Sequence, residues 1–203
     1  MSKPLRWGIL GTGWIADLFV QDLQLTGHQV VGVGSRAPET AQRFAARFGI
    51  PNAHGSYESL VADPQVDIVY VATPHPMHAS NAMAALNAGK HVLIEKPFTV
   101  NAAEARGIVD LAKAKNLVVL EAMWTRFLPH MRRIREIIAS GALGTVYSVV
   151  ADHTRDLPDD PKHRLNALEL GGGALLDLGI YPISFAWDIL GQPQEIQIGR
   201  AHV

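Results

Sequence analysis

Short apolar runs alternate with helical patterns through the first part of the chain. The runs occupy residues 5–10, 29–33, 67–72, 91–94 and 117–120. Between them, apolar residues recur at the three- and four-residue spacing of an amphipathic helix, as do Ile15, Leu18, Phe19 and Leu23. This alternation predicts βαβ units and therefore a mostly parallel sheet with helices on its faces.

Residues that favour the start or the end of a helix occur at the boundaries of the predicted helices. Pro38 is expected in the first turn of a helix that runs to Phe48, and Gly49 is expected to end it. Glycine 89 closes a helix predicted over residues 77–88. Asn101 is a predicted N-cap, with Glu104 three residues later, for a helix that reaches about residue 115.

The alternation of short apolar runs and helical patterns ends after Glu121. Residues 145–152 form a predicted strand, and residues 154–174 have the Asp, Pro, Arg and Gly content of a loop. A helix over residues 180–190 and a strand over residues 195–203 are expected to follow. We therefore predict two domains: an α/β, Rossmann-type doubly wound parallel sheet in residues 1–121, and the first part of a second domain in residues 122–203.

The composition is that of a folded protein with a small-molecule ligand. Hydrophobic residues make up 48% of the 203 residues, and charged residues make up 18%. The 18 lysines and arginines nearly balance the 19 acidic residues, so there is no basic field for nucleic acid or an anionic membrane. We expect neither as a partner.

The absence of cysteine excludes disulfides, cysteine-ligated zinc, iron-sulfur clusters and thiol nucleophiles. No signal-peptide core and no run of 18 consecutive apolar residues is present, so a cytoplasmic location is expected. Histidines 75, 78, 153 and 163 invite a metal interpretation. They lack the carboxylate-histidine spacing of known zinc or iron sites, so no metal is predicted.

Residues 11–16 read Gly-Thr-Gly-Trp-Ile-Ala between a predicted strand and a predicted helix, which is the context of a dinucleotide-binding turn. The first glycine allows the tight turn, the second lets the backbone approach a pyrophosphate, and the small Ala16 lets helix and strand pack closely. A simple glycine turn is the alternative. The predicted cofactor-binding residues here are Gly11, Thr12, Gly13, Trp14 and Ile15.

The end of the second predicted strand indicates which dinucleotide is bound. An NAD site usually has Asp or Glu there, whereas this strand ends with Gly34, Ser35 and Arg36. A guanidinium and a hydroxyl suit the 2′-phosphate of NADP, and no carboxylate repels it. We therefore predict NADP rather than NAD, with a solvated surface arginine as the alternative.

The tripeptide Glu95-Lys96-Pro97 lies at the carboxyl end of a predicted buried strand, where ligands of doubly wound sheets bind. An ordinary Lys-Glu pair is the alternative.

Several motifs in a fixed order resemble the glucose-fructose oxidoreductase/inositol dehydrogenase (Gfo/Idh/MocA) family. They are residues 11–13, Thr73-Pro74, and residues 88–97, which read Ala-Gly-Lys-His-Val-Leu-Ile-Glu-Lys-Pro. Residues 121–129 and 171–182 narrow the resemblance to the branch that is similar to dimeric dihydrodiol dehydrogenases and NADP-dependent D-xylose dehydrogenases. The resemblance runs along nearly the whole chain.

The resemblance implies roles for individual residues. It places Lys96 by the nicotinamide ribose and the reacting oxygen, and Pro97 in a cis or tight-turn setting. Tyr181, four residues after Asp177, stands where many members have a histidine, and becomes the predicted acid/base. A core tyrosine at the start of a helix is the alternative for Tyr181. The predicted catalytic residues are Lys96, Tyr181 and Asp177.

The resemblance also extends the two binding sites. The cofactor site gains Thr73, Pro74, His75, His78, Glu95 and Lys96, with His75 standing where the family has Asn. The substrate cleft is predicted to contain Trp124, Arg126, His153 and Arg164.

The predicted activity is hydride transfer between NADP and a sugar or polyol-like alcohol, of the D-xylose or trans-dihydrodiol type. Oxidising an alcohol requires a base that takes the hydroxyl proton. Tyrosine is a poor base near neutral pH unless a neighbouring cation favours its phenolate, and Lys96 is the predicted cation. The alternative is an NADP-binding protein without turnover, either a redox sensor or an inactive truncated fragment.

Members of this family usually continue well beyond such a chain and complete an open antiparallel sheet that forms a subunit interface. The resemblance therefore implies that residues 122–203 are a partial α+β domain with an incomplete antiparallel sheet. Unpaired strand edges promote association. We expect the chain to be part of a longer, homodimeric protein, or else to be poorly soluble and weakly active.

Overall fold

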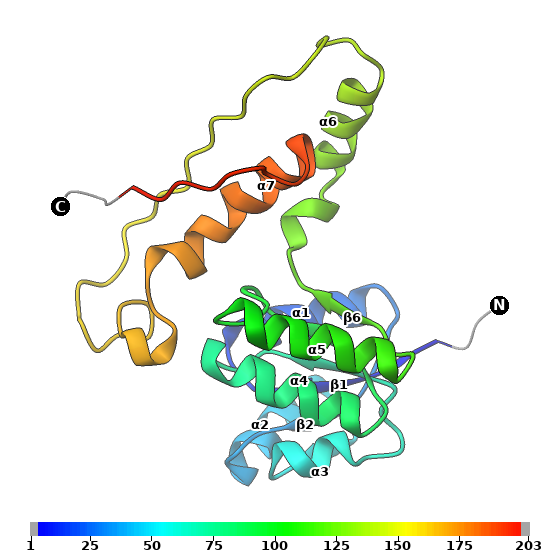
Figure 1. Cartoon of the computed structure of the whole chain (residues 1–203). Coiled ribbons are helices and arrows are strands. Elements are labelled where there is room, and N and C mark those ends of the chain that lie inside the picture. The colour runs from blue at the N-terminus through cyan, green and yellow to red at the C-terminus, as the bar shows by residue number, and fades with distance from the viewer. Residues whose placement is uncertain (1–3, 200–203) are drawn as a thin grey trace.

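Six parallel strands form the centre of the N-terminal part of the molecule (Figure 1). The computed structural model describes residues 4–199. The order across the sheet is β3-β2-β1-β4-β5-β6. The chain moves outward from β1 to β2 and β3, and then continues on the other side of β1 with β4, β5 and β6. This reversal of the winding order confirms the Rossmann-type prediction. The strands are β1 (Arg6–Leu10), β2 (Gln29–Gly34), β3 (Asn52–His54), β4 (Ile68–Val71), β5 (His91–Ile94) and β6 (Val119–Glu121).

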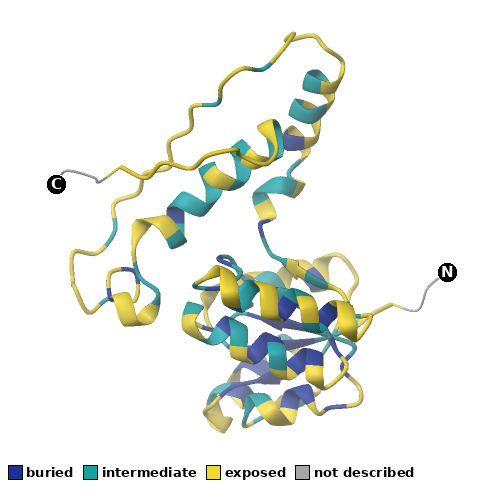
Figure 2. Ribbon diagram, in the orientation of Figure 1, coloured by how far each residue is buried: buried dark blue, intermediate teal, exposed yellow. Residues whose placement is uncertain are grey.

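Helices cover both faces of this sheet and enclose two apolar cores. On one face, α1 (Trp14–Leu25) and α2 (Pro38–Phe48) pack against β1, β2 and β4. On the other face lie α3 (Tyr57–Val61), α4 (His78–Asn87) and α5 (Ala102–Ala114). The buried residues follow the strands and the inner sides of these helices (Figure 2). Because both faces are covered, the strands read as nearly continuous apolar runs.

The predicted helix boundaries are confirmed by local geometry. Pro38 occupies the first turn of α2, and Gly49 ends that helix in the left-handed region, at φ 65°. Asn101 caps α5, because its side-chain oxygen accepts a 2.9 Å hydrogen bond from the Glu104 backbone N–H. The Asn101 amide in turn donates to the Glu104 carboxylate at 3.0 Å, which completes a reciprocal cap.

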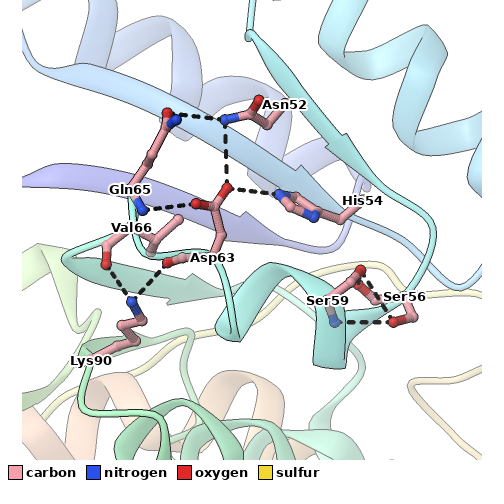
Figure 3. Close-up of polar contacts among 8 residues, drawn as sticks. All are labelled: Asn52, His54, Ser56, Ser59, Asp63, Gln65, Val66 and Lys90. Atoms are coloured by element: carbon pink, nitrogen blue, oxygen red, sulfur yellow. Dashed lines mark hydrogen bonds and ion pairs between the residues drawn. The ribbon is translucent and has the colours of Figure 1, made fainter.

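Strand β3 and helix α3 were not predicted, since three and five residues are too short to show a period. Polar contacts hold them in place (Figure 3). The Ser56 hydroxyl caps α3 by accepting from the Ser59 N–H at 3.1 Å. Behind the helix, the Asp63 carboxylate lies 3.0 Å from His54 Nε2. The buried Lys90 ammonium donates to two backbone carbonyls of the same loop at 2.7 and 2.8 Å.

The C-terminal part contains helices and long irregular segments (Figure 1). Its helical elements are η2 (Trp124–Phe127), α6 (Pro129–Ala139), η3 (Leu168–Leu170), the π-helical turn η4 (Leu175–Gly179) and α7 (Ile180–Leu190). The helix predicted over residues 180–190 is thus confirmed. The Asp188 carboxylate joins these elements, since it accepts from Arg126 at 2.7 Å and from Arg135 at 2.8 Å.

The strand predicted over residues 145–152 is wrong, because these residues are irregular coil in the structure. Residues 195–199 of the second predicted strand are also irregular, and residues 200–203 lie outside the described part of the chain. A strand needs a neighbour for its backbone hydrogen bonds, and the described residues supply none here. Tyr147 and Val150 are accordingly 88% and 90% exposed.

One helical run, Leu168–Leu190, is long and apolar enough to cross a membrane by length and composition alone. Two of its carboxylates already have cationic partners elsewhere in the chain. Asp177 pairs with Lys96, and Asp188 pairs with Arg126 and Arg135. These ion pairs connect the run to the Rossmann part, to η2 and to α6.

Candidate active site

The segments predicted to bind a cofactor follow neighbouring strands at one edge of the sheet. In the register of the sheet, Leu10 at the end of β1 lies opposite Gly34 of β2 and Val71 of β4. Val71 lies opposite Ile94 at the end of β5. Residues 11–15, 35–36, 73–75 and 95–97 therefore gather at the carboxyl edge, at the point where the winding direction reverses, which is where doubly wound sheets bind ligands.

The glycine turn after β1, residues 11–13, leaves open space at the start of α1, and this space is called the glycine cradle. Gly11 has φ +103°, and its N–H donates to the Gly34 carbonyl at 3.0 Å. A Cβ at Gly11 would lie 2.7 Å from the Ala72 carbonyl oxygen, so only glycine fits. Gly13 is the N-cap of α1 without a side-chain cap, and a Cβ there would meet nothing within 4 Å. The uncapped N–H groups of α1 suit an anionic pyrophosphate.

The residues around the turn differ in exposure. Trp14 is 77% exposed, whereas Thr12 and Ile15 are half-buried. The indole of Trp14 therefore stands on the surface beside the cradle.

Arg36 lines a pocket of about 410 Å³ beyond the end of β2. Its side chain is exposed, while Ser35 is buried and accepts from the Ala37 N–H at 3.3 Å. Most of the lining comes from the start of α3 and from α4, and sequence reasoning missed it because α3 was missed. The Ser56–Ser59 capping pair is the feature of the sequence that could have predicted α3. The other lining residues are Gly55, Ser56, Tyr57, Glu58, Met77, Ser80, Asn81 and Ala84.

Hydrogen bonds between buried polar groups stabilise the loop after β4. Asn81 donates from its amide to the Thr73 hydroxyl at 3.0 Å. His78 is fully buried, and its two ring nitrogens each lie 2.8 Å from a carbonyl oxygen, of Pro97 and of Thr73. The structure thus places His78 behind the site, with its nitrogens occupied by backbone, rather than at its surface. Pro74 is exposed, at the start of the short helix η1 (His75–Met77).

His75 connects this loop to the C-terminal part. Its Nδ1 lies 3.5 Å from the Gly171 carbonyl oxygen, and η1 contacts η3. Burial lowers the pKa of the His75 imidazole, and the positive charges of Arg164 and Lys96 lower it further. Arg164 is itself exposed, near His75.

Glu95 and Lys96 do not form an ion pair with each other at hydrogen-bonding distance. The Glu95 carboxylate accepts a short hydrogen bond from the Tyr70 hydroxyl and a 3.0 Å bond from the Lys96 backbone N–H. Burial raises the pKa of Glu95 and that of Tyr70. Glu95 therefore stabilises the backbone at the base of the site. The Lys96–Pro97 peptide is cis, in agreement with the setting implied by the resemblance.

The three predicted catalytic residues lie together. The Lys96 ammonium donates to the Asp177 backbone carbonyl at 2.9 Å and to its carboxylate at 3.1 Å. The same nitrogen lies over the Tyr181 ring, 5.0 Å from its centre. Lys96 thus contacts the face of Tyr181 rather than its hydroxyl. Asp177 belongs to a π-helical turn, an irregularity that is often found at functional sites.

Two of the predicted substrate residues surround Tyr181. The Trp124 indole N–H donates to the Tyr181 hydroxyl oxygen at 3.2 Å. The His153 ring stacks on the Tyr181 ring with their centres 4.9 Å apart. The guanidinium of Arg126, in contrast, is held by Asp188, 2.7 Å away. Sequence reasoning missed Asp188, whose partners lie more than fifty residues earlier in the chain.

Comparison with known proteins agrees with this geometry. Residues 5–123 match the oxidoreductase family with an NAD-binding Rossmann fold, and residues 131–202 match the GFO/IDH/MocA C-terminal domain. The chain belongs to the GFO/IDH/MocA oxidoreductase family. The predicted membership is therefore confirmed, and it extends over both parts of the chain.

Among curated members of the family, the D-xylose 1-dehydrogenase (NADP(+)) of Hypocrea jecorina is 46% identical over 94% of this chain. The trans-1,2-dihydrobenzene-1,2-diol dehydrogenase of Mus musculus is 43% identical over 98% of it. The chain spans 55% and 61% of the lengths of these two relatives.

Solved structures of GFO/IDH/MocA type align with most of the chain. A 3-ketoreductase from Actinomadura kijaniata, in complex with NADP and TDP-benzene, has a TM-score of 0.84 at 34% identity, and covers 93% of this chain and 58% of its own. A levoglucosan dehydrogenase in complex with NADH and levoglucosan also has a TM-score of 0.84, at 29% identity, and covers 94% of this chain and 55% of its own.

Proposed function

We propose that this member of the family is an NADP-dependent dehydrogenase that acts on a sugar or polyol-like alcohol, of the D-xylose or trans-dihydrodiol type. The observation that carries the proposal is the cluster of Lys96, Asp177 and Tyr181 at the edge of the sheet that also bears the glycine cradle. The names of the xylose and dihydrodiol dehydrogenases support the substrate class.

The residues present fit NADP. The open space at Gly13 and the uncapped start of α1 would hold the pyrophosphate. Arg36, in the pocket after β2, would hold the 2′-phosphate through charge-assisted hydrogen bonds. When bound, NADP supplies or accepts the hydride. One of the two solved neighbours is in complex with NADP and the other with NADH, so the proposed preference of this chain for NADP rests on Arg36 and on the similarity to the xylose dehydrogenase.

The residues of the cluster divide the proton chemistry between them. Asp177 holds the Lys96 ammonium in place, and Lys96 brings a positive charge to the Tyr181 ring. The Tyr181 oxygen exchanges a proton with the substrate oxygen, as a base in oxidation and as an acid in reduction. The positive charge of Lys96 over the Tyr181 ring favours the oxyanions that form during the transfer.

The test is calorimetric titration of the chain with NADP and, separately, with NAD, followed by absorbance at the reduced-nicotinamide band after addition of D-xylose or the trans-dihydrodiol. Binding of NADP with reduction supports the proposal. Binding without reduction favours an NADP-binding protein without turnover, and no binding of either dinucleotide defeats the site.

Variants assign the roles. Lys96→Ala and Tyr181→Phe should each lower turnover at least about a hundredfold, with NADP affinity nearly unchanged.

A further variant tests the preference for NADP. Arg36→Ala should weaken the binding of NADP tenfold to a hundredfold, about 1.5–3 kcal/mol, and leave the binding of NAD unaffected. Arg43→Ala, an exposed arginine on the neighbouring helix α2, is the matched control and should change neither affinity. Equal losses of NADP and NAD in Arg36→Ala would contradict the NADP preference.

We also propose a cytoplasmic, homodimeric protein with neither nucleic acid nor membrane as a partner. Cell fractionation and sedimentation of the chain as it is expressed test these two points.

A further inference from the structure

Tyr181 has a hydrogen-bond partner that the predicted mechanism does not use. The Trp124 indole N–H donates to the Tyr181 hydroxyl oxygen at 3.2 Å, and the two rings meet edge to face, with centres 6.2 Å apart and planes at 75°. Trp124 comes from η2, directly after the Rossmann sheet, whereas Tyr181 opens α7. The contact therefore joins two elements that are 57 residues apart.

The direction of this hydrogen bond is unambiguous. An indole nitrogen is a donor only, whereas a phenol both donates and accepts. Trp124 must therefore donate, and the Tyr181 oxygen must accept. The bond occupies a lone pair of that oxygen and leaves its hydrogen free. A deprotonated Tyr181 oxygen would accept the same bond more strongly, because hydrogen bonds to ionised acceptors are shorter and stronger.

The other neighbours of Tyr181 contact its ring. Lys96 lies over the ring with its nitrogen 5.0 Å from the centre, and His153 stacks on the ring at 4.9 Å. The Asp177 carboxylate accepts from Lys96 at 3.1 Å. Within residues 4–199, no recorded acceptor takes the Tyr181 hydroxyl hydrogen, so Trp124 alone holds the oxygen while the ring is held by the other side chains.

We propose that Trp124 is a positioning residue of the reaction: its N–H fixes the Tyr181 oxygen and directs the remaining hydrogen toward the substrate oxygen. This inference rests on the proposed function, in which Tyr181 exchanges a proton with the substrate. In oxidation, the hydride of the alcohol carbon would pass to NADP while the Tyr181 oxygen, as phenolate, takes the hydroxyl proton. In reduction, the hydride would return to the substrate carbon and the Tyr181 hydroxyl gives its hydrogen to the substrate oxygen. Throughout, the Trp124 N–H stays bonded to the same oxygen and takes no proton itself.

The hydrogen bond can be tested without any turnover. The chain has 4 tryptophans and therefore four indole N–H signals in a proton–nitrogen NMR spectrum. Trp124→Phe removes one signal and so identifies it. Tyr181→Phe should then shift that signal upfield and leave the Trp187 signal in place, since the indole loses its acceptor. An unmoved Trp124 signal in Tyr181→Phe overturns the inference.

The functional test compares Trp124→Phe with Trp187→Phe. Trp187 is also half exposed, at 48% against 55% for Trp124, and it lies on α7 without a recorded side-chain hydrogen bond, so it is the matched control. Loss of one net hydrogen bond predicts an approximately tenfold lower kcat for Trp124→Phe, with unchanged NADP affinity and little change in the substrate KM. Trp187→Phe should keep the wild-type kcat.

A shape-matched replacement separates the N–H from the aromatic ring. Substituting Trp124 by benzothienylalanine keeps the ring outline and exchanges the N–H for sulfur, and it should lower kcat as much as Trp124→Phe does. Full activity of this replacement would show that only the ring matters and would overturn the inference. A wild-type chain without turnover defeats the proposed function itself, whereas a fully active Trp124→Phe variant defeats only the role of Trp124.

Discussion

At the scale of single residues, the candidate cofactor site depends on two glycines with different tasks. Gly11 is required by the fold, because its φ of +103° and the Ala72 carbonyl oxygen, 2.7 Å from the place of a Cβ, leave no room for a side chain. Gly13 is not required by the fold, since its φ is −80° and a Cβ would meet nothing within 4 Å. The space in front of Gly13 is therefore open to a ligand.

The two alanine variants should separate stability from binding. We expect Gly11→Ala to lower the free energy of unfolding by about 1–3 kcal/mol, through the strained backbone and the close contact. We expect Gly13→Ala to unfold at nearly the wild-type urea concentration but to bind NADP at least about tenfold more weakly, because its methyl group enters the pyrophosphate cradle.

Urea unfolding and calorimetry with NADP measure the two effects. Wild-type NADP affinity in Gly13→Ala would contradict a close approach of the cofactor to this turn.

At the scale of elements, one buried side chain joins the loops that follow β4 and β5. The His78 nitrogens lie 2.8 Å from the carbonyl oxygens of Thr73 and Pro97, and Pro97 directly follows Lys96. Burial lowers the pKa of the His78 imidazole, an effect that the carbonyl contacts only partly oppose. The position of Lys96 relative to the cofactor loop thus depends on a buried histidine that lies behind the site.

The lowered pKa predicts a pH dependence of stability. As the pH falls below the usual histidine value of about 6.5, the unfolded chain takes up a proton that folded His78 does not, so the free energy of unfolding falls. At higher pH both states are neutral and this cost is absent. We expect the wild type to lose more stability between pH 7.5 and 5.5 than His78→Gln does.

Urea unfolding at the two pH values measures this difference, with exposed His130→Gln on α6 as the control that should keep the wild-type slope. The comparison between variants is needed because burial raises the pKa of Glu95 and Glu121, which acts in the opposite direction as the pH falls. Equal losses in wild type and His78→Gln would contradict a lowered pKa of His78 in the folded protein.

At the scale of the whole molecule, residues of the C-terminal part are mostly exposed or half-buried (Figure 2), and many apolar side chains are among the exposed ones. Exposed apolar surface of this extent marks a site of association. The most exposed large side chains of this part, each above 60%, are Phe127, Leu143, Tyr147, Val150, Leu168, Ile196 and Ile198.

We therefore expect the chain to associate with itself as its concentration rises. Tyr147→Lys combined with Val150→Lys should reduce this association, because charged residues oppose the pairing of exposed, extended segments. Sedimentation velocity over a concentration series measures it. Leu25→Lys, at an equally exposed position (84%) on the Rossmann part, is the control and should leave association unchanged. A monodisperse wild type at every concentration would contradict this expectation.

The sequence by itself determined those features of the protein that depend on residues close together in the chain. The apolar runs of β1, β2, β4 and β5, the Asn101 cap, the Gly49 terminus and the glycine turn were all predicted, because each depends on residues that are neighbours in the sequence. The predicted catalytic residues Lys96, Asp177 and Tyr181 also came from the sequence, through motifs that resemble a known family, and the structure brings these three residues together.

Only the tertiary structure decided what depends on distant partners. Residues 145–152 have the composition of a strand and yet remain irregular, because a strand exists only beside another strand. Arg126 could not be seen to pair with Asp188, nor Trp124 with Tyr181, since 62 and 57 residues separate them. His78 was predicted to bind the cofactor, whereas the packing of two loops buries it with its ring nitrogens against backbone carbonyls. Burial and long-range pairing arise from how elements pack, and no local pattern in the chain records them.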